Sequence, residues 1–548
     1  MSNNQLLTNQ WLIYGSFVLC AIISVALKVN ILDVGAPFVT IDDNTTYEGG
    51  FLVWFGQAPP QRMYIESWLN GLSSITTYII YQLQNGGSIG VNIVADAYNH
   101  YQISPDLYVK SYRLVSLFID LLSAYFIFLT ARIILPSQHH IKALAVTALY
   151  LLSYNTIWCY VIARPDNPMV LLSSIGLYLY YRSNFGANVS AFFLAALFFG
   201  AATGMKLHGA FFVVFIVLDL LRVHGFKKVL PLAIPFGVIS VVAFFVAAGS
   251  ALFDPLTYIK LRALNAKDDV SPWIQWGDQF WEIIQGTGFL IIPLILAAIV
   301  VAIKTKLWRT QDKIVSIILL SILWLLLFGS IRQLRAYWML PALPLFYILG
   351  IYGLFQLKKQ WQSIIVLLAL FLLMGYQSYK QSSQFGLTQF DEFQAWTNAN
   401  LAQDESLFIF GYDALFLPVS KTTVNNISAG YSTIMAGAKN SGESFTERHV
   451  RFWEERSRLM LFDMYIPPAK SYTYYSYYKT PLADFSELIV FRDTNYIAVL
   501  EGFVADDIDL NALITSKYNF VTSVTGPGGG GSGLTYAIYE KKVNSFGK

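Results

Sequence analysis

The chain has 548 residues, of which 55% are hydrophobic and only 13% are charged, and its formal net charge is +3. In soluble proteins charged residues make up about a quarter of the chain, so this composition excludes an ordinary soluble enzyme. No segment has the composition of a nucleic-acid-binding region. The chain is therefore expected to be an integral membrane protein that contacts membrane lipids over much of its surface.

Apolar windows recur from the beginning of the chain to about residue 376. A transmembrane helix needs roughly 20 mostly apolar residues. About eleven windows meet or approach this length: 11–29, 113–134, 143–162, 167–181, 189–203, 208–222, 229–249, 283–303, 314–330, 336–356 and 362–376. The first is expected to be a retained helix, because it lacks a basic leader and a small-residue cleavage site. The sequence predicts a polytopic helical body over residues 1–376 and a tail without spans at 377–548.

The distribution of Lys and Arg predicts the orientation. Short cytoplasmic loops of membrane proteins are enriched in both residues. If residues 1–10 are cytoplasmic, nearly all Lys and Arg of the short connections fall on the inner side, with Asp312 almost the only acid among them. The long connection 30–112 and the tail 377–548 are then outside the cytoplasm.

The first outer connection, residues 30–112, is too long for a simple loop. Trp68 to Leu83 is an amphipathic stretch, which is typical of a helix that lies in the membrane interface. Asp42 and Asp43 come before it, in the run Val39-Thr-Ile-Asp-Asp-Asn-Thr-Thr-Tyr47. Acids just outside a span favour chemistry at the membrane face, and a lid without chemistry is the alternative.

Several cations in the outer connections go against the positive-inside pattern. Arg164, Lys206, Arg332 and Arg335 lie in short outer turns at the ends of spans, and Arg62 lies in the long first connection. Cations at headgroup depth are costly to hold close together, so an anion such as a lipid phosphate explains the set. Each one taken singly is also explained by snorkelling to ordinary lipid phosphates.

Asp166 lies at the same outer face, in the run Ala163-Arg-Pro-Asp166. It is a candidate catalytic acid beside Asp42 and Asp43. An ion pair or a helix cap is the alternative, because the following Asn167-Pro168 is typical of a helix start. A divalent cation is expected only if the three acids converge, since hard cations favour carboxylate oxygens.

The tail 377–548 is expected to be a small α/β domain. Its predicted helices are Thr388–Ala402 and Ser444–Tyr465, and its predicted strands are 406–412, 488–491, 496–500, 520–524 and 534–539. The run Gly528 to Gly533 is expected to connect the last two strands, and it lacks the following helix and Lys of a phosphate-binding loop. Tyr472 to Tyr478 is expected to lie at the membrane surface, with stacking on sugar rings as the alternative.

Several motifs taken together resemble one known family. They are the acid pair followed by Tyr after the first span, Arg113-Leu-Val-Ser at the second span, Ala163-Arg-Pro-Asp166, Gly204-Met-Lys206 and Arg335-Ala-Tyr-Trp-Met-Leu-Pro-Ala-Leu-Pro344. Their order and common outer side resemble the GT-C glycosyltransferases, in the branch of protein mannosyltransferases and lipid A aminoarabinose transferases. The likeness covers about residues 10–376, and the tail resembles the small extracytoplasmic domains of bacterial members.

The resemblance implies transfer of a sugar from a polyprenyl-phosphate donor to an acceptor outside the cytoplasm, in the bacterial inner membrane. The acceptor is a lipid, a glycan or a protein. Asp42 matches the leading acid of the family, and Asp43 stands where Glu is usual, so either can be the catalyst. Gln57-Ala-Pro59 falls where relatives carry an acid and a Lys, so Arg62 is the expected substitute.

The residues fit this chemistry without the resemblance. A carboxylate can deprotonate or orient the acceptor, and Arg and Lys can stabilise a phosphate leaving group. Displacement in one step would invert the anomeric centre. The main alternative is a transporter or flippase of a lipid-linked or polar substrate, but transporters usually place ionisable residues near the bilayer midplane and often contain internal repeats. A non-catalytic scaffold that presents the tail leaves the outer cations unexplained.

Overall fold

The computed structural model divides the chain into two units. The first comprises Met1–Leu32, Tyr64–Leu69 and Arg113–Ser382, and the second comprises Asp33–Met63, Asn70–Tyr112 and Ser383–Lys548. The structure describes residues 3–32, 68–103, 105–135, 139–161, 166–248, 255–256, 283–284, 287–289, 291–306, 312–329, 336–356, 360–385, 396, 399–400, 406–411, 462–466, 470–476, 495–500, 508–526 and 534–542.

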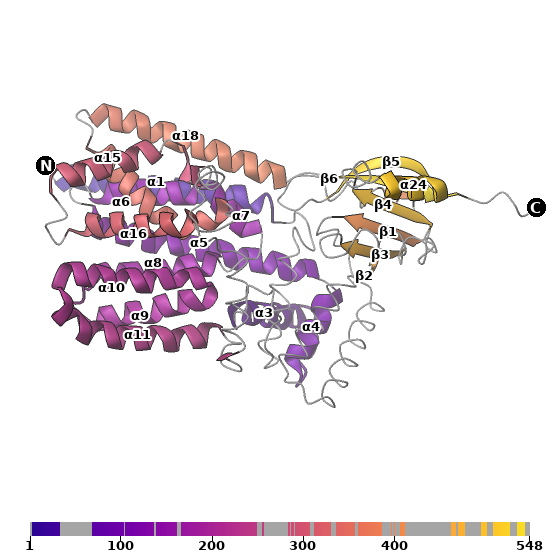
Figure 1. The fold of residues 1–548 in the computed structure, drawn as a ribbon, viewed down its shortest axis with the longest axis horizontal. Helices are drawn as coiled ribbons and strands as arrows, with labels where there is room; N and C mark the ends of the chain where they lie inside the picture. Colours follow the sequence, from indigo (N-terminus) through magenta and orange to yellow (C-terminus); the bar gives the residue numbers. More distant parts are fainter. Residues whose placement is uncertain are drawn as a thin grey trace, which may run out of the picture. The chain divides into compact units, whose positions relative to one another are not determined.

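The first unit is a bundle of long helices that run roughly alongside one another (Figure 1). Its helices are α1 (Asn3–Val29), most of α5 (Pro105–Ile134), α6 (His139–Leu151), α7 (Tyr154–Val161), α8 (Asp166–Arg182), α9 (Val189–Met205), α10 (Ala210–His224), α11 (Phe226–Ala248), α15 (Ile291–Lys304), α16 (Lys313–Gly329), α17 (Leu343–Leu354) and α18 (Gln360–Phe385). Two short 3₁₀ helices, η1 (Leu207–Gly209) and η3 (Ala336–Met339), stand before α10 and α17. Each apolar window predicted from the sequence contains a helix.

Among the described residues, four helices are long and apolar enough to cross a membrane. They are Leu107–Ile134, Leu207–His224, Phe226–Ala248 and Trp361–Lys380. Helices α6 and α7 pass the same test together, but the chain bends by 46° between them, so the single span predicted at 143–162 is broken. The hydroxyl of Ser153 accepts a hydrogen bond from the Asn155 N–H at this break, which caps the start of α7. The protein is therefore a helical membrane protein, and the number of eleven spans stays a prediction.

Small residues allow α9 and α11 to pack closely. Ala196, Gly200 and Gly204 recur every four residues on α9, and a Cβ atom at Gly200 would lie 2.1 Å from the carbonyl oxygen of Ser240 on α11. The Ser240 hydroxyl donates a 3.0 Å hydrogen bond to the carbonyl of Ala196. Helices in membranes associate through such close contacts, because lipid tails are as apolar as the helices. The packing fixes the C-terminal end of α9, where Lys206 follows.

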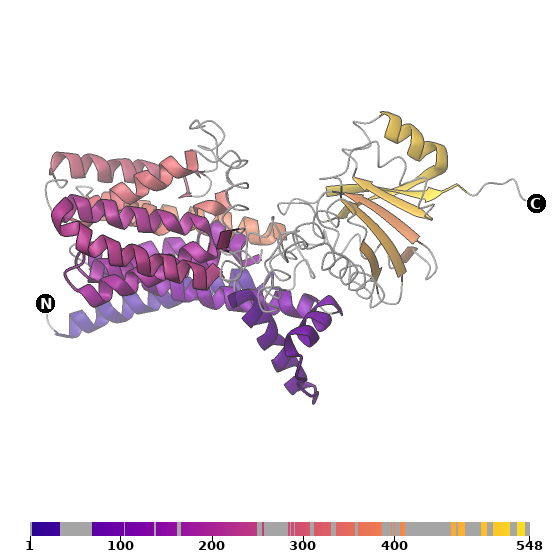
Figure 2. The ribbon, with the colours of Figure 1, turned by 60° about the horizontal axis from the view of Figure 1, so that its bottom comes forward.

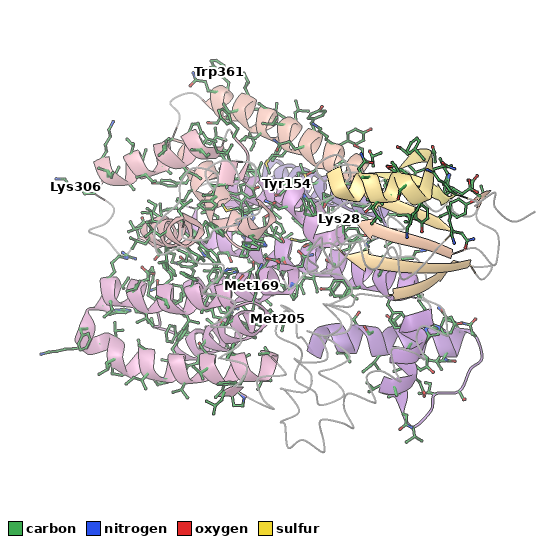
Figure 3. All side chains as sticks on the ribbon, turned by 45° about the vertical axis from the view of Figure 1, so that its right-hand side comes forward. Lys28, Tyr154, Met169, Met205, Lys306 and Trp361 are labelled. Atoms are coloured by element: carbon green, nitrogen blue, oxygen red, sulfur yellow. The ribbon has the colours of Figure 1, made fainter. Side chains whose placement is uncertain are left out.

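Buried polar side chains form a stripe along α5. Arg113, Ser116, Asp120 and Ser123 are spaced by three or four residues, so they share one face of the helix. Asp120 accepts a 2.7 Å hydrogen bond from Lys28 in the last turn of α1, which Figure 3 labels, and both side chains are fully buried. Charges inside a membrane protein are costly unless they are paired. This ion pair therefore sets the position of α1 against α5.

We expect Lys28→Met to destabilise the protein by about 3–5 kcal/mol, because it leaves the Asp120 carboxylate buried without its cation. The double variant Lys28→Met, Asp120→Leu removes both charges and should recover most of this loss. Thermal unfolding of the purified protein in detergent measures both effects. Equal stability of the single variant and the unmodified protein would contradict the assignment of a buried ion pair.

The second unit contains α3 (Trp68–Gln84), α4 (Ile93–Ile103) and the first turns of α5. Helix α3 covers the stretch predicted from Trp68 to Leu83, so the helix is confirmed and its place in the membrane interface stays a prediction. The rings of Tyr81 and His100 lie 4.3 Å apart and join α3 to α4. His100 Nδ1 is also 2.9 Å from the hydroxyl of Tyr108 on α5, so the three helices share one aromatic cluster.

The tail holds a mixed six-stranded sheet in the order β2-β3-β1-β4-β6-β5. The strands are β1 (Ser406–Gly411), β2 (Phe462–Ile466), β3 (Lys470–Ser476), β4 (Tyr496–Leu500), β5 (Tyr518–Gly526) and β6 (Leu534–Lys541). Strand β1 is parallel to β3 and β4, and the other neighbouring pairs are antiparallel. Helix α24 (Ile508–Lys517) lies over one face of the sheet and leads directly into β5 (Figure 2).

The structure confirms some of the tail predictions and corrects others. The predicted strands 406–412, 496–500, 520–524 and 534–539 correspond to β1, β4, β5 and β6, and the glycine run lies between β5 and β6. The predicted strand 488–491 and most of the predicted helices 388–402 and 444–465 lie outside the described residues.

Of two further tail segments, one differs from its prediction and the other keeps a prediction that stays untested. The end of the predicted helix Ser444–Tyr465 is wrong, because β2 occupies Phe462–Ile466. Most of the Tyr-rich segment Tyr472–Tyr478 forms strand β3 between β1 and β2, and its place at the membrane surface stays a prediction. Tyrosine and threonine favour strands, but only pairing with neighbouring strands decides such short segments.

Candidate functional site

The structure describes two of the residues predicted for the site, Asp166 and Lys206. The others lie outside the described residues, and their roles stay predictions: Asp42, Asp43, Arg62, Arg164, Arg332 and Arg335. The described part of the site is therefore built around the turns that carry Asp166 and Lys206.

Asp166 and Lys206 form an ion pair. Asp166 is the first residue of α8, and Lys206 follows directly after α9. The Lys206 Nζ atom lies 2.8 Å from Asp166 Oδ1; the carboxylate is fully buried and the lysine side chain is 13% exposed. Met169 and Met205, which Figure 3 labels, belong to one buried apolar cluster together with Ala202. The ion pair that the sequence left as an alternative for Asp166 is thus present.

The pair keeps hydrogen-bonding capacity for a further group. Asp166 Oδ2 is buried and has no hydrogen-bond partner among the described residues. The Lys206 ammonium carries three donors, and one of them is used on Asp166. Because the carboxylate balances the charge of Lys206, this lysine alone cannot neutralise a phosphate. A phosphate site here needs further cations, and the candidates predicted from the sequence lie outside the described residues.

The backbone after α9 fixes the place of Lys206. Lys206 is extended (φ −155°, ψ 131°), which ends α9, and its carbonyl accepts a 2.8 Å hydrogen bond from the Gly209 N–H. A Cβ atom at Gly209 would lie 2.5 Å from the Thr203 nitrogen and 2.6 Å from the Ala202 carbonyl carbon. Only glycine fits this turn without moving the backbone.

Asn167 ties the start of α8 to two other helices. Its Nδ2 atom donates to the Ser116 hydroxyl on α5 and to the Cys159 carbonyl on α7, the latter over 3.2 Å. The side chains of Asn167 and Ser116 are fully or almost fully buried. Asp166 is therefore held at a point where α5, α7 and α8 meet.

Arg113 joins the ends of α1 and α7. Its guanidinium is almost fully buried and donates to the carbonyls of Ile31 (3.3 Å), Leu32 (2.8 Å) and Val161 (3.2 Å). Carbonyls at the end of a helix lack intrahelical partners and carry partial negative charge, so a buried cation stabilises them. In the sequence, one of these ends precedes the segment with Asp42 and the other precedes Asp166. Arg113 and Ser116 thus give the Arg113-Leu-Val-Ser motif a structural role.

Trp338 and His208 are further described residues near Lys206. The Lys206 Nζ atom lies 5.1 Å from the centre of the Trp338 ring. The centres of the His208 and Trp338 rings lie 6.1 Å apart. Trp338 belongs to η3, which begins directly after Arg335. The fold therefore brings the Gly204-Met-Lys206 and Arg335-Ala-Tyr-Trp motifs together. The sequence prediction missed Trp338, although an aromatic residue three positions after a predicted site cation was a usable signal.

The described residues do not hold a metal cluster: no group of three or more His, Cys, Asp or Glu side chains occurs among them. Asp42 and Asp43 lie outside the residues searched, so a cation held by these acids with Asp166 stays a prediction.

The described fold defines the class of this protein: a helical membrane bundle with a mixed β-sheet in its tail. No protein-family model and no curated protein sequence matches the chain.

Among solved structures, the chain is similar to ArnT from Cupriavidus metallidurans bound to undecaprenyl phosphate, with a TM-score of 0.50 and 12% identity over 95% of this chain and 98% of that one. Apo ArnT gives a TM-score of 0.49 at 13% identity, with 96% and 98% covered. The apo Archaeoglobus fulgidus oligosaccharyltransferase gives 0.45 at 12% identity, with 73% and 62% covered. ArnT is a lipid A aminoarabinose transferase of the GT-C class, so the resemblance predicted from the motifs is confirmed as a likeness of fold.

We expect Gly209→Ala to destabilise the protein by about 1–3 kcal/mol and to displace Lys206, because the new methyl group meets backbone atoms that cannot move aside. Thermal unfolding in detergent measures the loss. The matched control is Gly237→Ala in the interior of α11, where a Cβ atom has no neighbour within 4 Å. This control should be neutral or stabilising by up to about 1 kcal/mol. Equal behaviour of the two variants would contradict the tight turn.

Proposed function

We propose that the protein is a membrane glycosyltransferase that moves a sugar from a polyprenyl-phosphate donor to an acceptor outside the cytoplasm. The observation that supports this most is the partly exposed Lys206, fixed by Asp166, on a fold similar to that of ArnT. The crystallised ArnT held undecaprenyl phosphate, which is a ligand of the proposed chemical class. The proposed membrane is the bacterial inner membrane, with an odd number of spans before an extracytoplasmic tail.

The proposed phosphate site combines one described cation with several from neighbouring segments. Lys206 contributes its two remaining donors, and Arg62, Arg164, Arg332 and Arg335 contribute charge that Asp166 does not balance. Hydrogen bonds between cations and phosphate are about twice as strong as neutral ones. This charge stabilises the polyprenyl phosphate as it leaves, which is where the negative charge develops in the reaction.

The proposed reaction is a single displacement. An acceptor hydroxyl attacks the anomeric carbon, the bond from that carbon to the phosphate oxygen breaks, and the proton of the hydroxyl passes to a carboxylate. We assign this base to Asp42 or Asp43 in the first outer connection. Asp166 acts through Lys206, because its Oδ1 already binds that ammonium. One displacement inverts the anomeric centre.

We expect Lys206→Ala, Arg164→Ala and Arg335→Ala each to weaken binding of undecaprenyl phosphate by roughly one to two decades. The reason is the loss of a charge-assisted contact, which costs about 1.5–3 kcal/mol. Titration of the purified full-length protein in detergent measures the affinity. Arg182→Ala is the control, since Arg182 is exposed at the other end of α8 from Asp166. Unchanged affinity in all three variants would indicate that these cations contact ordinary lipid phosphates and do not bind the donor.

We expect Asp42→Asn to abolish sugar transfer and to leave donor binding nearly unchanged, because the amide keeps the shape of the side chain and cannot take a proton. The loss of a general base typically costs about 10²–10⁴-fold in rate. Transfer of labelled sugar from the lipid carrier to membrane acceptors in proteoliposomes measures the rate.

Asp43→Asn is the matched control for this variant. If Asp42 is the base, the Asp43 variant loses distinctly less activity, and the reverse result assigns the base to Asp43. Full turnover by the double variant would overturn the mechanism. A transporter would keep moving its substrate without any transfer of sugar to an acceptor, so the same assay separates enzyme from transporter.

A further inference from the structure

The Lys206 ammonium has a carboxylate and an aromatic ring close to it. Asp166 Oδ1 is 2.8 Å away, and the centre of the Trp338 ring is 5.1 Å away. A cation within about 6 Å of a ring centre is attracted by the electron-rich face of the ring, most strongly for tryptophan. Lys206 is therefore attracted by two groups of different chemistry.

Trp338 is well placed to hold the ammonium in one position. Its own side chain is half-buried and packs on the core of the bundle, and the next residues, Met339 and Leu340, are fully buried. This anchors η3 and the indole that it carries. The lysine side chain, by contrast, ends in a mobile point charge on a flexible four-carbon stem. Its direction depends on what surrounds it.

The two partners of Lys206 have different effects on a bound anion. The carboxylate of Asp166 fixes the ammonium and also balances its charge. The ring fixes the ammonium without balancing it, because an aromatic face has a quadrupole and no net charge. The ring therefore orients Lys206 and leaves its attraction for an anion intact.

We propose that Trp338 is a positioning residue that holds the Lys206 ammonium toward the phosphate of the lipid donor. The inference rests on the proposed function, since it assigns Lys206 to that phosphate. It adds a residue that acts through Lys206 and needs no contact of its own with the donor. The competing explanation is that Trp338 only fills space in the bundle.

A double-mutant cycle separates these two explanations. The probe is undecaprenyl phosphate, titrated into the purified full-length protein in detergent. Trp338→Leu should weaken binding about threefold to thirtyfold, the range that corresponds to cation–π contacts, and Trp338→Phe should weaken it less because a ring remains. In the K206M background, Trp338→Leu should cause no further loss.

Trp324→Leu is the matched control. Trp324 is fully buried in α16 and packs against Phe211, Phe212 and Phe328, so the same substitution removes the same ring from a site that lacks Lys206. We expect it to lower the midpoint of thermal unfolding and to leave the affinity for undecaprenyl phosphate unchanged.

The outcomes distinguish this inference from the proposed function. An equal loss from Trp338→Leu with and without Lys206 would show that the ring only packs, and so would an unchanged affinity of both Trp338 variants. If the unmodified protein binds undecaprenyl phosphate and the K206M variant binds it more weakly, the proposed function survives either result of the cycle. If the unmodified protein does not bind it, the proposed function is overturned and the inference falls with it.

Discussion

The ion pair between Lys206 and Asp166 is the interaction on which the described site depends. It joins the turn after α9 to the start of α8, and its carboxylate is fully buried. A buried carboxylate is stable only when a cation and hydrogen bonds compensate for the lost water. The fold must therefore hold both turns at a fixed separation. The lysine that satisfies this need is also the described cation that is partly exposed beside Trp338 and His208.

Helix α5 provides much of this rigidity. Along one face it holds Arg113 against the ends of α1 and α7, Ser116 against Asn167 on α8, and Asp120 against Lys28 on α1. Apolar contacts alone do not fix the position of one helix against another in a membrane, because lipid tails are as apolar as the side chains. Polar contacts do fix it, since a shift of one helix by a turn would leave buried charges and carbonyls unpaired. The stripe thus fixes α1, α7 and α8 against α5.

Catalysis by such a site would depend on how several ordinary cations are arranged around the phosphate, more than on any one unusual side chain. A salt-bridged lysine holds a phosphate weakly by itself, and several cations from separate turns are needed to stabilise a leaving phosphate. The likeness to ArnT extends over 95% of the chain at 12% identity, so the fold is retained while almost every side chain differs.

The sequence alone determined the membrane class, the helical windows and four strands of the tail, because hydrophobic length and alternation are local properties. It also selected Asp166 and Lys206 as candidate residues of one site. Only the tertiary structure decided that they pair with each other, that Trp338 lies against Lys206, and that Phe462–Ile466 is a strand. Each of these depends on contacts between residues far apart in the chain, which neither periodicity nor charge counting contains.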